Sequence, residues 1–157
     1  MLRTILPRLA RMALLALLAA GPGMAPAPAA AQQSAAVPQS ALQRLAAHRA
    51  AAGVPPLRRD ARLEAAARSH ALWMARTGRY GHEGRGGTRM TDRARAAGYC
   101  YRALAENIAF GMPGADQVIE GWMGSPSHRR NALSGALSDF GLAGADGYWV
   151  MLIGRAC

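Results

Sequence analysis

The first 31 residues limit the possible folds most, because they have the order of an export signal and leave residues 32–157 for a folded domain. Three arginines among the first eleven residues form a basic start, residues 12–20 are apolar, and the alanines at 29–31 suit a cleavage site. The apolar run is much shorter than the ~20 residues needed to span a bilayer. We therefore expect cleavage after Ala31, secretion to the periplasm or the cell exterior, and no transmembrane anchor after processing.

The two cysteines, Cys100 and Cys157, both follow the predicted cleavage site and would meet an oxidising environment. They allow only one pairing, so we predict a disulfide between them. A metal site on two cysteines so far apart, or a reactive thiol at the last residue, fits the sequence less well.

The charge of the chain suits an anionic partner but does not indicate a nucleic-acid interface. All 19 Lys and Arg residues are arginines, and the formal net charge is +10. A lipid head group or a cell-wall polymer would be attracted to this charge, although an arginine- and alanine-rich genome gives the same composition. The arginines are scattered, and no basic run is interleaved with aromatic residues, so nucleic acid is not a predicted partner.

The segment that follows the predicted signal is rich in Pro, Ala, Gln and Ser, which predicts a disordered linker over residues 32–40. The folded domain is then expected to cover residues 41–157. Ser40 is placed to cap a first helix, which would end at Gly53.

A second helix is predicted over residues 61–77, with Asp60 as its N-cap and Gly78 after its last turn. Its apolar residues recur at helical spacing, and His70 lies among them as a buried histidine.

The remaining pattern predicts an α+β fold, because helices come first and an antiparallel hairpin closes the chain. The expected elements are a short helix from Thr91 to Gly98, an extended piece over 105–110, a helix over 115–123, a helical turn after Ser125, and hairpin strands over 139–144 and 148–155.

Four residues are candidates for chemistry. His82 and His128 lie where the chain turns, and the first turn of a helix should keep His128 neutral, as a metal ligand or a general base must be. Glu106 lies in a mostly apolar segment, where a carboxylate needs a partner. Ser125 lies three residues before His128. A polar network that only joins loops would explain the first three equally well.

Several stretches of the sequence resemble the bacterial branch of the CAP superfamily, also called SCP-like domains. Cysteine-rich secretory proteins, insect venom allergens (antigen 5) and plant pathogenesis-related proteins belong to the same superfamily. The resemblance runs from about residue 41 to the end of the chain. The matching stretches, in family order, are residues 49–57 (RAAAGVPPL), 67–74 (ARSHALWM), 81–82 (GH), 97–99 (AGY), 105–109 (AENIA) and 121–131 (GWMGSPSHRRN).

The resemblance implies an α-β-α sandwich, in which helices flank a small antiparallel sheet around a central cleft. In the family, two histidines and two acidic residues line this cleft and can hold a divalent metal. His82, Glu106 and His128 match three of these positions, and Ser125 stands where the second acid is expected. The resemblance thus implies a weak site for zinc or another divalent metal, with one coordination position left for water.

Two functions follow as hypotheses. The first is a secreted binding module whose cleft holds a small molecule, lipid, glycan or other cell-envelope ligand, since most of the family has no established catalysis. The second is a peptidase-like hydrolase that uses His128, Glu106 and Ser125. As the predicted cap of a helix, the Ser125 hydroxyl would already be engaged, so we favour binding over catalysis. The sequence gives no indication of the oligomeric state.

Overall fold

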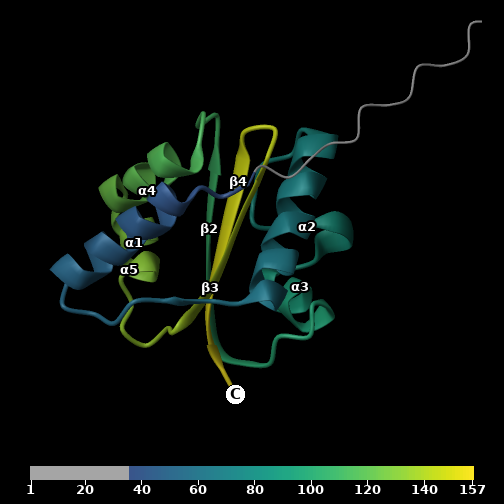
Figure 1. Cartoon of the computed structure of the whole chain (residues 1–157). Coiled ribbons are helices and arrows are strands. Elements are labelled where there is room, and N and C mark those ends of the chain that lie inside the picture. The colour runs from purple at the N-terminus through teal and green to yellow at the C-terminus, as the bar shows by residue number, and fades with distance from the viewer. Residues whose placement is uncertain (1–35) are drawn as a thin grey trace, which may run out of the picture. The chain divides into compact units, whose positions relative to one another are not determined.

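The structure, a computed structural model, describes residues 36–157, in which a sheet is covered by helices on both faces (Figure 1). Helices α1, α4 and α5 lie on one face and α2 and α3 on the other, which confirms the predicted α-β-α sandwich. The predicted export signal and residues 32–35 of the predicted linker lie outside the described residues. The elements are α1 (Gln39–Ala51), β1 (Arg58–Arg59), α2 (Ala61–Thr77), the 3-10 turn η1 (Arg85–Gly87), α3 (Met90–Ala96), β2 (Tyr101–Phe110), α4 (Ala115–Gly124), α5 (Pro126–Ala132), β3 (Asp139–Ala145) and β4 (Tyr148–Ala156).

Helix α2 begins and ends as predicted. The Asp60 carboxylate accepts hydrogen bonds from the backbone N–H groups of Arg62 (2.9 Å) and Leu63 (3.3 Å), which satisfies two of the free donors of the first turn. Gly78 ends the helix in the left-handed conformation, with φ +67°, which costs glycine little.

The predicted Ser40 cap of α1 is wrong. Its N-cap is Pro38, so the helix begins within the predicted linker, and the Ser40 hydroxyl instead donates to the Asp116 carboxylate of α4 at 2.8 Å. Ser40 therefore joins two helices of the same layer, a contact between residues far apart in the sequence.

The sheet has the strand order β1-β3-β4-β2. β3 and β4 form the predicted hairpin, and β4 pairs antiparallel with β2. The sheet is nevertheless mixed, because Arg58 and Arg59 pair in parallel with Asp139 and Phe140 of β3.

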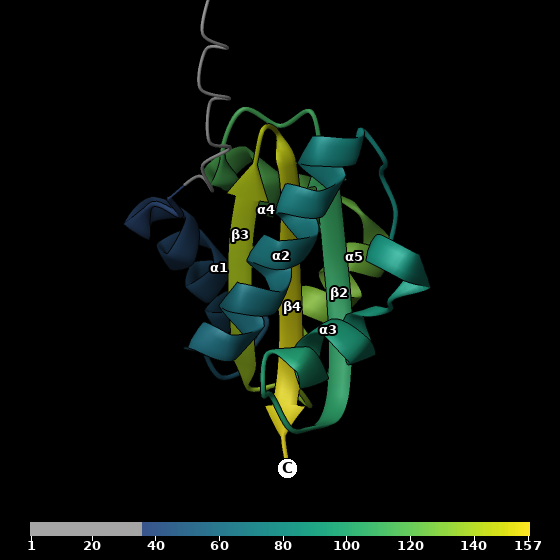
Figure 2. The ribbon, with the colours of Figure 1, turned by 90° about the vertical axis from the view of Figure 1, so that its right-hand side faces the viewer.

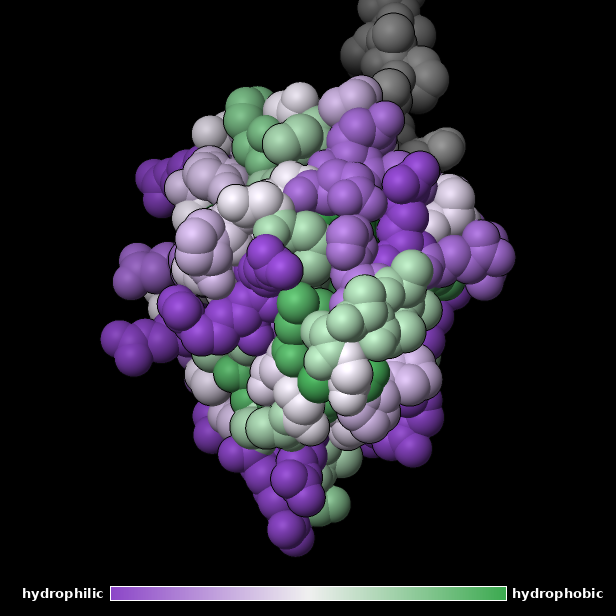
Figure 3. All heavy atoms as spheres, turned by 90° about the vertical axis from the view of Figure 1, so that its left-hand side faces the viewer, coloured by the Kyte–Doolittle hydropathy of each residue, from purple (hydrophilic) through white to green (hydrophobic). Residues whose placement is uncertain are grey.

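The central strand β4 divides the core, because successive side chains of a strand point to opposite faces. Trp149, Met151 and Ile153 pack with the helices of the α1, α4 and α5 layer. Val150 and Leu152 pack with α2 and α3, and Figure 2 shows α2 lying along the sheet on that side. On the outside of the first layer, hydrophilic side chains surround smaller apolar areas (Figure 3).

The outer edge of the sheet is β2, and side chains hydrogen-bond to its backbone there. The Ile108 carbonyl accepts from the Trp122 indole N–H at 3.1 Å and from the Tyr80 hydroxyl at 3.3 Å. The Glu106 carbonyl accepts from the Asn131 amide at 3.4 Å. Because these donors come from both layers, β2 lies between the loop that carries His82 and the helix that carries His128.

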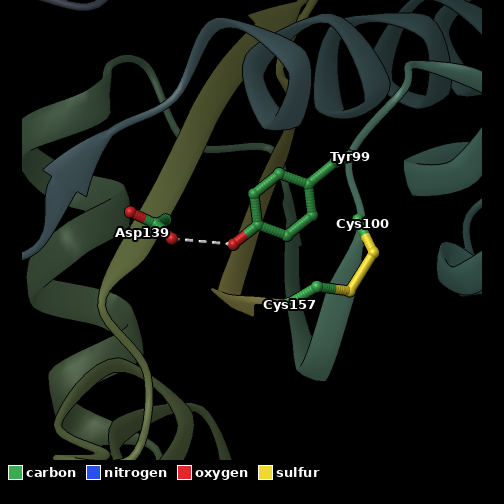
Figure 4. The surroundings of a disulfide bond; sticks show 4 residues. All are labelled: Tyr99, Cys100, Asp139 and Cys157. Carbon is green, nitrogen blue, oxygen red and sulfur yellow. Dashed lines mark hydrogen bonds between the residues drawn. A yellow bond between two sulfur atoms is a disulfide. The ribbon is translucent and has the colours of Figure 1, made fainter.

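The predicted disulfide is confirmed: Cys100 bonds to Cys157, with the two Cα atoms 5.5 Å apart (Figure 4). It joins the start of β2 to the end of β4. Beside it, the Tyr99 hydroxyl donates to the buried Asp139 carboxylate at 2.8 Å. No helix within residues 36–157 is long and apolar enough to cross a membrane.

Candidate functional site

Two consecutive residues of β2 connect the sheet to the two helical layers. Glu106 and Asn107 are both buried, and the alternation of a strand sends their side chains to opposite faces. Glu106 reaches the α2 and α3 layer, whereas Asn107 donates to the backbone carbonyl of His128 in α5 at 2.9 Å. The segment that contains the candidate acid Glu106 therefore also connects the sheet to both helical layers.

Each carboxylate oxygen of Glu106 has its own partner. Oε1 lies 2.9 Å from Nδ1 of His82, and Oε2 accepts a hydrogen bond from Arg93 Nη2 at 2.6 Å. The Arg93 and Glu106 side chains are only 7% and 1% exposed, so they form a buried ion pair. This ion pair supplies the partner that a carboxylate in an apolar segment needs.

The Arg93 side chain also holds the surrounding loops. It donates to the backbone carbonyls of Thr88 at 2.8 Å and His82 at 3.2 Å. The sequence pattern does not distinguish Arg93, because arginines are scattered along the whole chain. The only signal was indirect: a buried Glu106 requires a donor.

The pair with Arg93 determines which nitrogen of His82 carries the proton. Glu106 is ionised in this pair and can only accept, so the His82 Nδ1–H donates to Oε1. In the neutral form of the ring, His82 Nε2 is then left with a free lone pair. Because 61% of the His82 side chain is exposed, Nε2 is available to a ligand.

His128 lies on the other side of the β2 edge, in α5. Its backbone carbonyl is held by Asn107, whose own carbonyl oxygen accepts from Asn131 at 2.9 Å. Burial first, and then the charge of His82, lower the pKa of His128. A pKa lowered in this way agrees with the neutral ring that was predicted. The main cause is burial, and not the start of the helix from which the prediction was made.

The predicted metal ligands do not fit a divalent ion as they are arranged here. Both oxygens of Glu106 are engaged, and one of them binds a cation already. His128 belongs to the opposite layer. Among residues 36–157, no three His, Cys, Asp or Glu side chains gather closely enough to hold a metal. Zinc binding by His82, Glu106 and His128 therefore stays a prediction.

Ser125 is not linked to the other candidates. Its hydroxyl lies 3.5 Å from that of Ser127, and it makes no capping bond to α5 although it is the N-cap residue. The predicted cap bond is therefore wrong. Within the described residues, no hydrogen bond connects Ser125 to His128 or Glu106, so the side chains of a serine hydrolase are not assembled.

A cleft of about 440 Å³ opens beside the His82–Glu106 pair. This volume lies within the range of small-molecule sites, roughly 300–1,000 Å³. The cleft combines an apolar part with charged and amide groups. Its lining residues are His82, Glu83, Arg89, Met90, Leu104, Ala105, Glu106 and Asn131.

A second hollow, of about 570 Å³, lies between α2 and α3 and includes His70 and Arg93 in its lining. His70 is buried as predicted and donates from Nε2 to the Gly81 carbonyl at 2.9 Å. Burial, followed by the charge of Arg93, lowers the pKa of His70. His70 thus holds the loop that carries His82, behind the cleft.

Comparison with known proteins relates this arrangement to one family. The sequence profile described as CAP, the cysteine-rich secretory protein family, matches residues 42–150. The chain is also similar to YkwD of Bacillus subtilis (strain 168), which is described as uncharacterized. The two are 29% identical over 90 residues, which make up 57% of this chain and 35% of YkwD. The chain thus spans about a third of that relative.

Three solved structures have a similar fold. An extracellular protein with an SCP domain from Bacillus anthracis str. Ames gives a TM-score of 0.72 at 21% identity, covering 74% of this chain and 39% of its own. An outer surface protein of Borrelia burgdorferi gives 0.70 at 19%, covering 80% and 99%. A cysteine-rich secretory protein from Staphylococcus aureus subsp. aureus Mu50 gives 0.55 at 19%, covering 74% and 38%. At these identities the likeness shows the fold alone.

Proposed function

Because this chain belongs to the cysteine-rich secretory protein family, in its bacterial branch, we propose that it is a secreted binding module whose His82–Glu106 cleft holds a cell-envelope ligand. The observation that carries the proposal is the exposed His82 ring, fixed from behind by a buried carboxylate at 2.9 Å. A polar group held in this way is oriented before the ligand arrives, which lowers the cost of binding.

The lining of the cleft favours a glycan segment. Met90, Leu104 and Ala105 offer apolar area to the faces of sugar rings. His82 Nε2 can accept a hydrogen bond from a hydroxyl, and the Asn131 side chain adds an amide group to the lining. A glycan presents hydroxyls and apolar ring faces together, which is the combination that this cleft contains.

Titration with soluble glycan fragments of a bacterial cell wall, followed by NMR, tests the proposal. The largest shifts should occur at His82 and along residues 104–106, and His82→Ala should weaken binding at least tenfold. His48→Ala is the matched control, because His48 contacts Glu120 on the opposite layer. Equal binding by the His82→Ala variant, or no binding by the wild type, would overturn the glycan assignment. A parallel titration with anionic lipid vesicles tests for a lipid ligand.

Hydrolysis is the second candidate function, and one observation favours it. A buried carboxylate that orients an exposed imidazole is an arrangement used by general bases, so His82 with Glu106 could activate water. Within residues 36–157 no base is hydrogen-bonded to the Ser125 hydroxyl, which would not be needed. Incubation with the same glycans and with peptides, analysed by mass spectrometry, should give products that are lost in His82→Ala and kept in Ser125→Ala. Absence of products in the wild type supports binding alone.

Secretion is the localisation that we propose. Relatives with this fold are described as extracellular or outer surface proteins, and the predicted export signal has the same implication. Mass spectrometry of the exported protein should find a chain that begins at or near Gln32. Recovery of a mature chain that still begins at Met1 would contradict this.

A further inference from the structure

We propose that Arg93 is the resident cation of the His82–Glu106 site, that it excludes a divalent metal from Glu106, and that it fixes the ring nitrogen that His82 presents to the cleft. The inference concerns the cleft itself and does not depend on which ligand the cleft takes.

The position of Arg93 is that of an internal group rather than of a surface ion pair. Its guanidinium contacts acceptors in three separate segments, at distances of 2.6 Å to Glu106, 2.8 Å to Thr88 and 3.2 Å to His82. With only 7% of the side chain exposed, these contacts are shielded from water. A surface arginine would exchange among solvent positions, whereas this one is held in a single place.

The backbone closes tightly on the guanidinium. A Cβ atom built on Gly84 would lie 3.1 Å from Arg93 Nη1, 3.3 Å from His70 Nδ1 and 2.8 Å from the Thr88 hydroxyl. A side chain at this position would therefore crowd the guanidinium from the side of the loop.

The charge balance of the site is already complete. Glu106 carries one negative charge and Arg93 one positive charge, and both are buried. A divalent ion at Glu106 would place two further positive charges against the guanidinium in a region where water screens poorly. It would also have to share a carboxylate oxygen with either Arg93 or His82, because each holds one of the two oxygens. Glu83 is the other carboxylate that lines the cleft.

The same cation determines the tautomer of His82. Because Arg93 donates to Oε2 of Glu106, Oε1 is left to accept from Nδ1 of His82, and in the neutral ring Nε2 carries the lone pair. If the cation is removed, Glu106 gains a free oxygen and His82 loses its fixed acceptor. Arg93 thus acts through Glu106 and His82, and it is a positioning residue for the cleft.

Calorimetric titration with zinc chloride alone, on chelator-treated protein, tests the inference in four proteins. The wild type and Arg93→Lys should not bind zinc at this site, because both keep a cation beside Glu106. Arg93→Met should gain zinc affinity at least tenfold above the wild type, and the added variant His82→Ala in that background should abolish the gain. Nitrogen-15 NMR of the imidazoles should show the Nδ1–H form of His82 in the wild type and in Arg93→Lys, and its loss in Arg93→Met.

One result would overturn the inference even if Arg93→Met fails to fold. If the wild type binds zinc, and a double variant His82→Ala, His128→Ala loses that binding while it keeps its circular dichroism spectrum, then the predicted metal site exists and Arg93 does not exclude it. Zinc binding that is equal in the wild type and Arg93→Met would overturn it as well. Neither result uses the glycan, so failure of this inference is distinguishable from failure of the proposed function.

Discussion

At the scale of the residue, Arg49 shows how a charge can be buried without a carboxylate. It is 1% exposed, and its guanidinium donates to the backbone carbonyls of Pro55 and Ala132 at 2.7 Å, Ser134 at 3.2 Å and Leu137 at 3.3 Å. The side chain thus joins the end of α1 to the connection between α5 and β3. Only a planar fork of donors can reach all four oxygens.

Arg49→Lys should lower the free energy of unfolding by about 2–4 kcal/mol, because one ammonium group leaves several buried carbonyls without donors. Urea denaturation measures this. Arg44→Lys is the control, since Arg44 forms a surface pair with Asp116, and such pairs contribute about 1 kcal/mol or less. Similar losses of stability in both variants would mean that the buried hydrogen bonds of Arg49 contribute no more than a surface ion pair.

The buried His70 and the half-buried His128 predict a dependence of stability on pH. The pKa values of His70 and His128 are lowered in the folded state, so the unfolded chain binds more protons below its own histidine pKa of about 6.5. The free energy of unfolding should therefore be level just above that pH and should fall as the pH drops below it. His128→Gln should reduce the slope between about pH 6.5 and pH 5, by at most ~1.4 kcal/mol per pH unit. Denaturant titrations at several pH values measure the slope, and an unchanged slope would contradict the assignment to His128.

The candidate site could be predicted in part from single residues. Glu106 stood out because an acid in an apolar segment needs a partner, and that partner proved to be Arg93 with His82. Arg93 itself could not be distinguished, because burial depends on tertiary packing and not on residue type. The convergence of His128 with His82 and Glu106 stays a prediction. The pleat of β2 sends Glu106 and Asn107 to different faces, and Asn107 holds only the backbone of His128. The charge of His82 still contributes to the lowered pKa of His128.

At the scale of the element, α2 rests directly on β3 at one glycine. A Cβ atom on Gly141 would lie 2.0 Å from the backbone nitrogen of Glu64 and 2.2 Å from the carbonyl carbon of Leu63. Backbone cannot move aside as the end of a side chain can, so α2 would have to shift away from the sheet.

Gly141→Ala should therefore destabilise the protein by about 3 kcal/mol or more, since overpacking of a tight core costs roughly 1–3 kcal/mol even where side chains can adjust. Thermal unfolding provides the measurement. Gly124→Ala, at the end of α4, meets nothing within 4 Å and should raise stability by up to about 1 kcal/mol. If both variants melt at the wild-type temperature, α2 does not pack as closely as described.

Elements with local signals were predicted well, and those that depend on distant partners were not. The Asp60 cap and Gly78 defined α2, and the turn at Gly147 separated the two hairpin strands. By contrast, β1 is two exposed arginines long and exists only because Asp139, some 80 positions later, lies beside it. No period or turn signal is present in so short a segment.

At the scale of the whole molecule, the disulfide closes the structure where β2 begins and β4 ends. It spans 57 positions, so reduction frees a long loop in the unfolded chain. In the chain-entropy model, loss of a bond across a loop of this size costs about 4 kcal/mol. A Cys100→Ser, Cys157→Ser variant should unfold at correspondingly lower urea, and the reduced wild type should behave in the same way. A loss below about 1 kcal/mol would show that the backbone pairing of the two strands suffices.

The side chains that cover the edge of β2 also affect how molecules meet at high concentration. An open strand of ten residues would act as a template on which a second copy could add its own strand, and repeated addition would build fibrils. Tyr80, Trp122 and Asn131 already occupy backbone carbonyls along the middle of this strand. A second copy would find those acceptors engaged, so the edge is a poor template for growth, and neighbouring molecules at high concentration should stay separate rather than polymerise.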